Sequence, residues 1–277
     1  MTVQIAGTSL PLLRRRPAFD AIAHDYDRIF THSILGKAQR SLVHEALRGH
    51  FRKGQRILDL NCGTGEDAIH LASMGISVLA CDVSERMLEV ARIKTASHQS
   101  NLPIAFAACA NEDLDTLQNR APFDGALSNF GGLNCTADLT SVGRSLASLV
   151  RPGGHVFLCL LGPFCAGEIF WYALRGQWRK AFRRMKDGGT ETKIAGAGLR
   201  VYYPAVREVR KAFAHSFELI SWRGIGVLLP PPWMEPLFQA RPTLVNLLTR
   251  MDRTLGRVPV FRGVADHVLF HFVREGK

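Results

Sequence analysis

A glycine-rich turn between an apolar strand and a helix is the part of this sequence best suited to chemistry. Residues 57–65 read Ile-Leu-Asp-Leu-Asn-Cys-Gly-Thr-Gly, and a helix-compatible run follows. Gly63 and Gly65 permit a tight turn and a close approach of the backbone to a ligand, which a Cβ atom would obstruct. A second apolar strand ends at Asp82, 23 residues after Asp59, about where a βαβ unit places the carboxylate that holds a ribose. The pattern predicts a site for a nucleoside-containing cofactor.

The residues around the turn distinguish between two kinds of cofactor. Residues 63–68 also satisfy the pattern G-x-G-x-x-A of dinucleotide sites, in which the turn and the helix N-terminus hold a pyrophosphate. A carboxylate at Asp59 would repel that anion and would suit a ligand that carries an amino group. The turn therefore favours a cofactor with a cationic group over a dinucleotide.

Three segments resemble the class I S-adenosylmethionine-dependent methyltransferases, in particular those that act on small molecules. Residues 59–65 and 81–88 (Cys-Asp-Val-Ser-Glu-Arg-Met-Leu) look like the first two motifs of that family. Residues 149–154 (Leu-Val-Arg-Pro-Gly-Gly) resemble the loop before its fifth strand, so that the resemblance spans about residues 50–161. It implies S-adenosyl-L-methionine as the cofactor and methyl transfer as the reaction.

The resemblance also implies which residues contact the cofactor. Tyr26 matches a tyrosine that closes over the cofactor in many small-molecule and quinone methyltransferases. Ala110 stands where the family commonly has an acidic residue, so Asn111 or Glu112 is expected to meet the adenine, and Asn61 replaces a common glycine. The full expected set is Tyr26, Asp59, Asn61, Gly63, Gly65, Asp82, Val83, Met87, Asn111, Glu112 and Asn129.

The segment after the fourth expected strand, residues 128–134, is where the methyl group should meet the substrate. It reads Ser-Asn-Phe-Gly-Gly-Leu-Asn, which is neither the Asn-Pro-Pro-Tyr motif of methyltransferases acting on adenine or glutamine nor a Pro-Cys pair for attack on cytosine. Methyl transfer is an in-line displacement in which the protein positions the reactants and, where needed, supplies a base. The candidate bases in the predicted covers are His24, His32, Glu168, Tyr202 and Tyr203, although a lone histidine is more often structural.

Strands that alternate with helices predict an α/β fold with a mainly parallel sheet. The expected strands are 56–60, 76–81, 104–108, 123–128, 155–161, 217–223 and 267–273. We expect a Rossmann-like, doubly wound, seven-stranded sheet with helical cap insertions, and the resembled family has an antiparallel last strand. The expected parts are an N-terminal helical cap (1–52) that starts with a loose arm (1–16), a cofactor-binding core (53–161), and the remainder of the sheet (162–277) with substrate-covering insertions at about 162–200 and 224–264.

Composition and charge limit the class of protein and its partners. The chain has 277 residues, 47% hydrophobic and 21% charged, with a net charge of +11. Residues 53–161 carry 8 basic and 11 acidic side chains, whereas 162–277 carry 19 and 9, so the excess positive charge surrounds the core. This asymmetry indicates an anionic partner or a solvated surface. Six cysteines without a C-x-x-C pair, an N-terminal stretch unlike a secretory signal and no apolar run long enough to span a membrane predict a cytoplasmic protein with reduced thiols and no metal site.

Two segments in the insertions combine aromatic with basic or proline residues. From Glu168 to Lys186, Trp171, Trp178 and other apolar residues recur at helical spacing beside six basic residues, although Gly176 weakens the helix. This stretch predicts a lid packed on the domain or a helix on an anionic membrane. Residues 228–234 (Leu-Leu-Pro-Pro-Pro-Trp-Met) fit a hydrophobic substrate pocket or a rigid connector.

The sequence thus predicts methyl transfer to O, N or C of a hydrophobic small molecule that resembles a quinone, a lipid or a polyketide. The alternatives are an RNA methyltransferase, which the net charge favours, and a non-catalytic regulatory or scaffold protein that binds S-adenosylmethionine.

Overall fold

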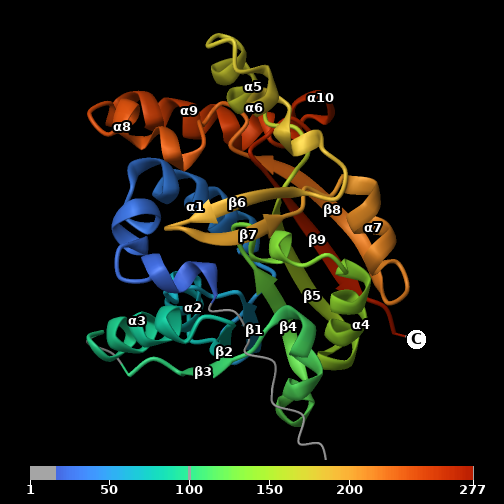
Figure 1. Cartoon of the computed structure of the whole chain (residues 1–277). Helices are drawn as coiled ribbons and strands as arrows, with labels where there is room; N and C mark the ends of the chain where they lie inside the picture. Colours follow the sequence, from blue (N-terminus) through green and yellow to red (C-terminus); the bar gives the residue numbers. More distant parts are fainter. Residues whose placement is uncertain (1–16, 99–100, 277) are drawn as a thin grey trace, which may run out of the picture.

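The computed structural model describes residues 17–98 and 101–276, so the expected arm at residues 1–16 lies outside the described residues. A seven-stranded sheet forms the centre of the protein, in the order β3-β2-β1-β4-β5-β9-β8 (Figure 1). The strands are β1 (Arg56–Leu60), β2 (Ser77–Asp82), β3 (Ile104–Ala108), β4 (Phe123–Ser128), β5 (Val150–Leu161), β8 (Phe217–Ile225) and β9 (His267–Arg274). Strands β1 to β5 are parallel, and β9 is antiparallel to both β5 and β8. This confirms the expected fold.

Alternating side chains on the strands build two apolar cores, one on each face of the sheet. Leu58 and Leu60 of β1 face a core formed with η3, α4 and α7, whereas Ile57 faces a core formed with α1, α2 and α9. The helices of the sheet layers are α1 (Ile34–Leu47), α2 (Glu66–Ser73), α3 (Glu85–Ala96), η3 (Asn111–Arg120), α4 (Leu139–Leu149), α7 (Val206–Phe213) and α9 (Pro242–Leu255).

Side-chain caps fix where several of these helices begin. Ser33, Ser84 and Asp138 each accept a hydrogen bond from a backbone N–H in the first turn of α1, α3 and α4. The helical segment of the second insertion is split into α8 (Glu235–Phe238) and α9, because Arg241 precedes Pro242 and a residue before proline disfavours the helical conformation.

The two insertions extend from the sheet beyond the carboxyl ends of its parallel strands. The first contains α5 (Ala166–Ala173), α6 (Trp178–Ala181), η5 (Arg183–Met185) and a hairpin of β6 (Thr190–Ile194) and β7 (Ala197–Val201). The second contains η6 (Pro232–Met234), α8, α9 and α10 (Pro259–Arg262), which lie at the same end of the molecule as α5 and α6 (Figure 1). Among the described residues, no helix combines the length and the apolar character needed to cross a membrane.

The basic stretch expected as one helix is broken into short pieces. Gly176, with φ +66°, separates α5 from α6, since a positive φ leaves the helical region. The hairpin was not expected from the sequence, although residues 190–201 alternate and turn at Ala195 and Gly196, both with positive φ. It packs against η1 (Ala18–Ile22) and η4 (Gly132–Cys135), and so reaches across to the N-terminal segment.

Candidate functional site

A cavity of about 250 Å³ opens at the carboxyl ends of β1, β2 and β4, as expected for a ligand site in such a sheet. Of the expected cofactor residues, these line it: Tyr26, Asn61, Gly63, Asp82, Val83, Met87, Asn111, Glu112 and Asn129. The other two, Gly65 and Asp59, do not line it. Gly65 precedes α2 with φ +77°, and Asp59 is buried at the end of β1.

The glycine-rich turn explains how asparagine can replace the first glycine of the motif. Asn61 has φ +56°, in the left-handed region that asparagine tolerates better than most residues, and Gly63 has φ +53°. The Asn61 amide donates to Oδ1 of Asn111 at 2.9 Å, and its Oδ1 accepts from the Ser128 hydroxyl at 2.9 Å. A Cβ on Gly132 would lie 2.2 Å from Cβ of Asn61, so a glycine there lets the two segments meet.

Asp82 joins the glycine turn to the start of α3. One carboxylate oxygen accepts from the Gly63 N–H at 2.9 Å, and the other accepts from the Ser84 N–H at 2.8 Å. Burial raises the pKa of Asp82 above its ordinary value, although these backbone donors oppose the rise. A carboxylate has about four lone-pair sites, so Asp82 can accept further hydrogen bonds from a ligand in the cavity.

Asp59 has an unsatisfied oxygen where a cationic ligand group would be stabilised. The side chain is buried, and within the described residues its Oδ2 has no hydrogen-bond partner. Burial raises the pKa of Asp59 well above its usual range, and the nearby Asp67 adds to the rise. Buried polar atoms usually have partners, so this oxygen is free to accept a hydrogen bond from a donor group of a ligand.

The N-terminal segment forms a roof over the turn. Tyr26 lies above Gly63, its ring 4.0 Å from where a Cβ would stand, and packs against Phe19 and Phe30 with centroids 6.3 and 5.7 Å away. Two hydrogen bonds fasten the roof: the Thr64 hydroxyl donates to Asp27 at 2.6 Å, and the Ser84 hydroxyl donates to Asp20 at 2.5 Å.

Lys94 strengthens one of these connections. Its ammonium group lies 2.7 Å from the Asp27 carboxylate. Burial opposes ionisation of Asp27, yet the hydrogen bonds from Lys94 and Thr64 hold its pKa below the ordinary value. The roof is therefore fixed to α3 as well as to the glycine turn.

A buried ionic network holds Asn129 at the cavity. Arg40 of α1 and His44 both pair with the Asp67 carboxylate, with a His44 to Asp67 distance of 2.7 Å. The Asn129 amide donates to the same carboxylate at 3.1 Å, and the Arg40 guanidinium lies 4.8 Å from the centre of the Phe130 ring. Through Asp67, α1 positions the segment expected to face the substrate.

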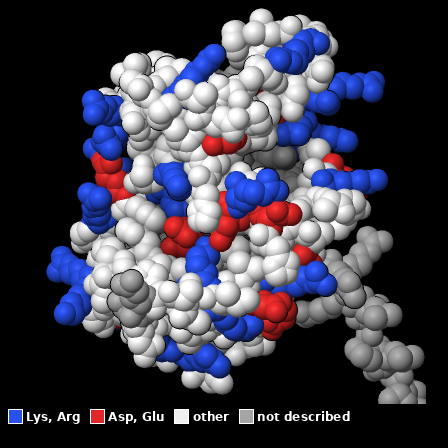
Figure 2. All heavy atoms as spheres, turned by 90° about the vertical axis from the view of Figure 1, so that its left-hand side faces the viewer, with Lys and Arg blue, Asp and Glu red and all other residues white. Residues whose placement is uncertain are grey.

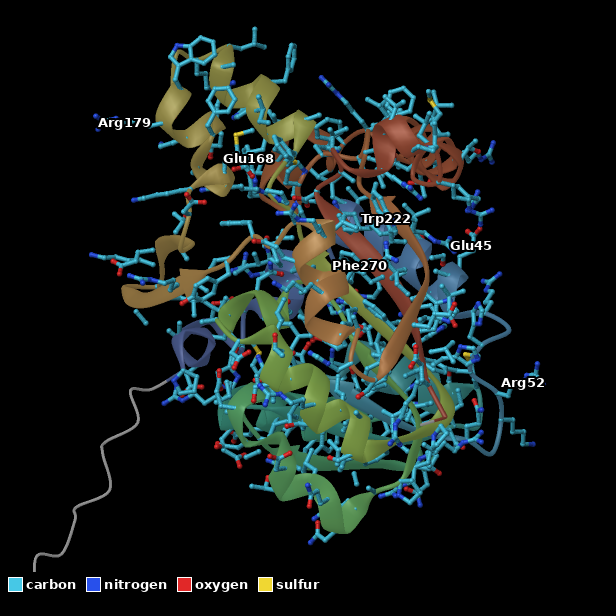
Figure 3. The ribbon with its side chains drawn as sticks, turned by 90° about the vertical axis from the view of Figure 1, so that its right-hand side faces the viewer. Glu45, Arg52, Glu168, Arg179, Trp222 and Phe270 are labelled. Carbon is cyan, nitrogen blue, oxygen red and sulfur yellow. The ribbon has the colours of Figure 1, made fainter. Side chains whose placement is uncertain are left out.

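The structure places the candidate bases outside this cavity. In the described part of the chain, neither His24 nor His32 lines it, and both are exposed. Glu168 points into the protein, with carboxylate oxygens 2.7 Å from both Arg183 and Arg184, whereas Arg179 at the outer end of the insertion points away (Figure 3). Glu168 thus serves an internal ion-pair network.

Tyr202 and Tyr203 line a separate cavity of about 530 Å³ beside η4 and α7. Burial raises the pKa of Tyr203, and its ring centre lies 5.5 Å from the Arg184 guanidinium. In the Pro-rich segment 228–234, Trp233 packs on Trp171 and Tyr172 with centroids 6.2 and 5.6 Å away.

The cavity wall also contains residues outside the expected cofactor set. Phe130 comes from the segment 128–134 that was expected to face the substrate, whereas Phe19, Cys135 and Leu199 were not predicted, and Leu199 belongs to strand β7 of the hairpin. Phe130, with φ +51°, and the glycine after it turn the chain into the cavity. The Gly-Gly pair at 131–132 was the sequence signal for this turn. No local sequence pattern indicated that the β6–β7 hairpin would reach the cavity.

A seven-stranded sheet in this order, with a covered cavity at the point where the strand order reverses, defines a Rossmann-like protein with a nucleotide-type cofactor site. Residues 57–154 match a family model described as a methyltransferase domain. Demethylmenaquinone methyltransferase of Symbiobacterium thermophilum is 34% identical over 152 residues, which are 52% of this chain and 57% of that protein. The ubiquinone biosynthesis O-methyltransferase of Xanthomonas axonopodis pv. citri is 33% identical over 108 residues, 39% of this chain and 44% of that protein.

Solved structures of other methyltransferases have a similar fold over most of this chain. The CcbJ methyltransferase from Streptomyces caelestis has a TM-score of 0.62 at 16% identity, covering 94% of this chain and 99% of that one. Phosphoethanolamine N-methyltransferase 2 of Haemonchus contortus, in complex with S-adenosyl-L-methionine, has a TM-score of 0.52 at 16% identity and covers 92% and 57%. Residues 57–154 thus match a methyltransferase domain in sequence, and the whole chain has the same fold as these solved methyltransferases.

Proposed function

We propose that this protein transfers a methyl group from S-adenosyl-L-methionine to O, N or C of a hydrophobic small molecule of the quinone, lipid or polyketide type. The observation that carries the proposal is the cavity at the glycine turn, where Asp82 lies in the wall, together with the unsatisfied oxygen of the buried Asp59. The demethylmenaquinone and ubiquinone methyltransferases among the similar proteins support a quinone-like substrate, although the chain spans only 57% and 44% of their lengths.

Each part of the cavity has a role in holding the cofactor, which when bound supplies an electrophilic methyl group on a sulfonium. Asp59 stabilises the cationic amino group, and Asp82 accepts hydrogen bonds from the ribose hydroxyls. Val83 and Met87 form the apolar side of the base site, with Asn111 and Glu112 as its polar side. The roof over Gly63 excludes water from the reacting groups.

Tyr26 acts in this scheme as a hydrogen-bond donor and not as a base. Burial raises its pKa to about 12, and the neighbouring carboxylates of Asp82, Asp67 and Asp27 contribute to the rise. The hydroxyl therefore stays protonated at neutral pH. Since the candidate bases lie elsewhere, we propose that catalysis rests on positioning, with Asn129 and Phe130 placed against the substrate.

We further propose that the enzyme meets its substrate at an anionic membrane surface. Phe170, Leu174 and Trp178 of the first insertion are 67%, 68% and 59% exposed, beside Arg175, Arg179 and Lys180. The second insertion adds exposed Leu244, Leu247 and Met251 on α9 and Val260 on α10. The upper part of the face in Figure 2, over α5, α8 and α9, is largely uncharged, with basic side chains scattered on it and at its edges. Apolar side chains ringed by cations suit binding to anionic lipid.

The test of the function is turnover with a labelled methyl donor. The protein is incubated with a metabolite extract and S-adenosylmethionine carrying a labelled methyl group, and products are followed by mass spectrometry. A labelled quinone or lipid supports the proposal. Binding of S-adenosylhomocysteine without any labelled product would instead support a binding or scaffold role. This alternative is considered because the fold is not limited to methyl transfer: a [4+2]-cyclase shares it with a TM-score of 0.55. Labelled RNA among the products would instead favour the alternative that the protein is an RNA methyltransferase.

A further inference from the structure

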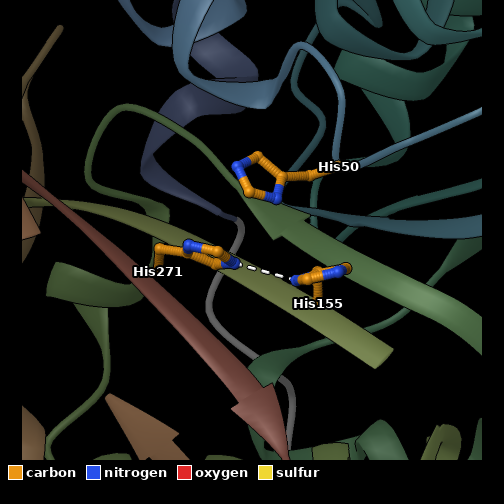
Figure 4. A group of neighbouring side chains, drawn as sticks. All are labelled: His50, His155 and His271. Atoms are coloured by element: carbon orange, nitrogen blue, oxygen red, sulfur yellow. Dashed lines mark hydrogen bonds between the residues drawn. The ribbon is translucent and has the colours of Figure 1, made fainter. Parts of the chain in front are cut away.

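Three histidines from distant parts of the chain meet on the α1 side of the sheet. His50 lies in the turn between α1 and β1, His155 on β5 and His271 on β9 (Figure 4). One potential ligand atom from each ring lies within 4.8 Å of the other two. Nδ1 of His155 and Nε2 of His271 share a hydrogen bond of 2.9 Å, the dashed line in Figure 4.

The surrounding packing holds the rings in these positions. The ring of His271 stacks on Phe157 with a centroid distance of 4.3 Å and an interplanar angle of 7°. The ring of His50 lies 4.5 Å from His271 and 5.1 Å from His155, in edge-on contact with both. The three side chains are therefore arranged before any ion binds, which lowers the cost of assembling a site.

The cluster offers imidazole nitrogens, which bind metal in their unprotonated form. A neutral imidazole ring has one such nitrogen. The hydrogen bond between Nδ1 of His155 and Nε2 of His271 uses one of these lone pairs, so a bound ion would take the place of the shared proton.

We propose that His50, His155 and His271 bind one divalent transition-metal ion of the zinc type, with a fourth position open to water. Three imidazoles are a ligand set that suits Zn²⁺, Co²⁺ or Ni²⁺ better than the hard ions Mg²⁺ and Ca²⁺. The ion would join the turn after α1 to β5 and β9, and so fix the N-terminal helix to the far half of the sheet. Arg223, Arg151 and Arg52 raise the local positive potential, so the ion is held less tightly than in a thiolate site.

The site is separate from the proposed methyl transfer. His155 stands six residues before Leu161 on β5, which at about 3.3 Å per residue puts it roughly 20 Å from the carboxyl end of the strand. The proposal therefore does not depend on the cofactor or the substrate.

The test uses the full chain, stripped of metal with a chelator and titrated with Zn²⁺ by calorimetry and with Co²⁺ by visible absorption. We expect one ion per chain and a higher Tm with Zn²⁺. His50→Ala and His155→Ala should each weaken binding at least tenfold, since each removes one of three ligands. His50 lies in a half-buried turn, so its variant is expected to fold, which circular dichroism verifies.

His70→Ala is the matched control, because His70 and His44 form the other histidine pair, with rings stacked at 3.6 Å. The control should keep the wild-type affinity and the wild-type rise in Tm. If His50→Ala and His155→Ala bind Zn²⁺ as the wild type does, or if only His70→Ala loses binding, the proposal is overturned.

Discussion

Asp59 and Asp82 end neighbouring strands, yet hydrogen bonding gives them different roles. Both oxygens of Asp82 already accept from the backbone, which orients the carboxylate toward the cavity. Asp82→Ala should weaken binding of S-adenosylhomocysteine by about 1–3 kcal/mol, as for loss of a charged hydrogen-bond partner. Calorimetry measures this, with Glu89→Ala on the exposed face of α3 as a control that keeps full affinity. Unchanged affinity in Asp82→Ala would show that Asp82 does not bind the cofactor.

Asp67 holds Asn129 at the cavity, and a substitution of Asp67 is expected to lower the stability of the protein. Asp67→Asn leaves the Arg40 guanidinium buried without its charge partner, which should cost about 3–5 kcal/mol in free energy of unfolding. Urea unfolding near neutral pH measures this loss. Arg92→Ala, which removes an exposed ion pair with Glu85 at 3.3 Å, should cost less than about 1 kcal/mol.

The pH dependence of the same variant follows from the pKa of Asp67. Burial opposes ionisation, but Arg40 and His44 hold the pKa of Asp67 well below its usual range. A depressed pKa in the folded state adds stability above the unfolded-state value of about 3.9, and that stability is lost as the pH falls further. The difference between wild type and Asp67→Asn should therefore be full near neutral pH and shrink below about pH 4. A difference that stays constant down to pH 3 would contradict the ion-pair assignment.

Among the elements, the β6–β7 hairpin forms the part of the cavity cover that the sequence did not reveal. The hairpin pairs only with itself among the described strands, and Leu199 is its contribution to the wall. Leu199→Ser should weaken binding of S-adenosylhomocysteine by about 1 kcal/mol, because part of a leucine side chain loses its apolar contact. Lys193→Ser, on an exposed position of the same hairpin, should leave the affinity unchanged. Equal affinities of the two variants would show that the hairpin does not cover the cofactor.

The elements also show what the sequence could and could not predict. The strands of the core were predicted to within about two residues at most ends, because apolar runs and glycine turns are local signals. The glycine turn and its strand-end aspartates were predicted for the same reason. The ion pairs of Glu168 were not predicted because its arginine partners lie 15 and 16 residues away, and the histidine cluster was not predicted because 116 residues separate His155 from His271. Contacts set by the fold leave no local pattern.

At the scale of the whole molecule, positive charge and exposed apolar side chains gather on the insertions that extend beyond the carboxyl edge of the sheet. A hydrophobic substrate dissolved in a bilayer would approach the protein at this end, where the cavity lies. The slightly acidic core and the basic insertions are consistent with the proposal that the core holds the cofactor and the insertions meet an anionic surface.

The final prediction tests this surface with vesicles. The protein should sediment with vesicles rich in anionic lipid but not with neutral ones, and salt should weaken the binding, since each cation near such a surface contributes about 1 kcal/mol. The double variant Arg179→Glu, Lys180→Glu should lose most of the binding. Arg207→Glu, Arg210→Glu on the exposed side of α7 makes the same change in charge and should bind almost normally. Equal losses in the two double variants would mean that net charge alone attracts the protein, and that the insertions form no specific membrane surface.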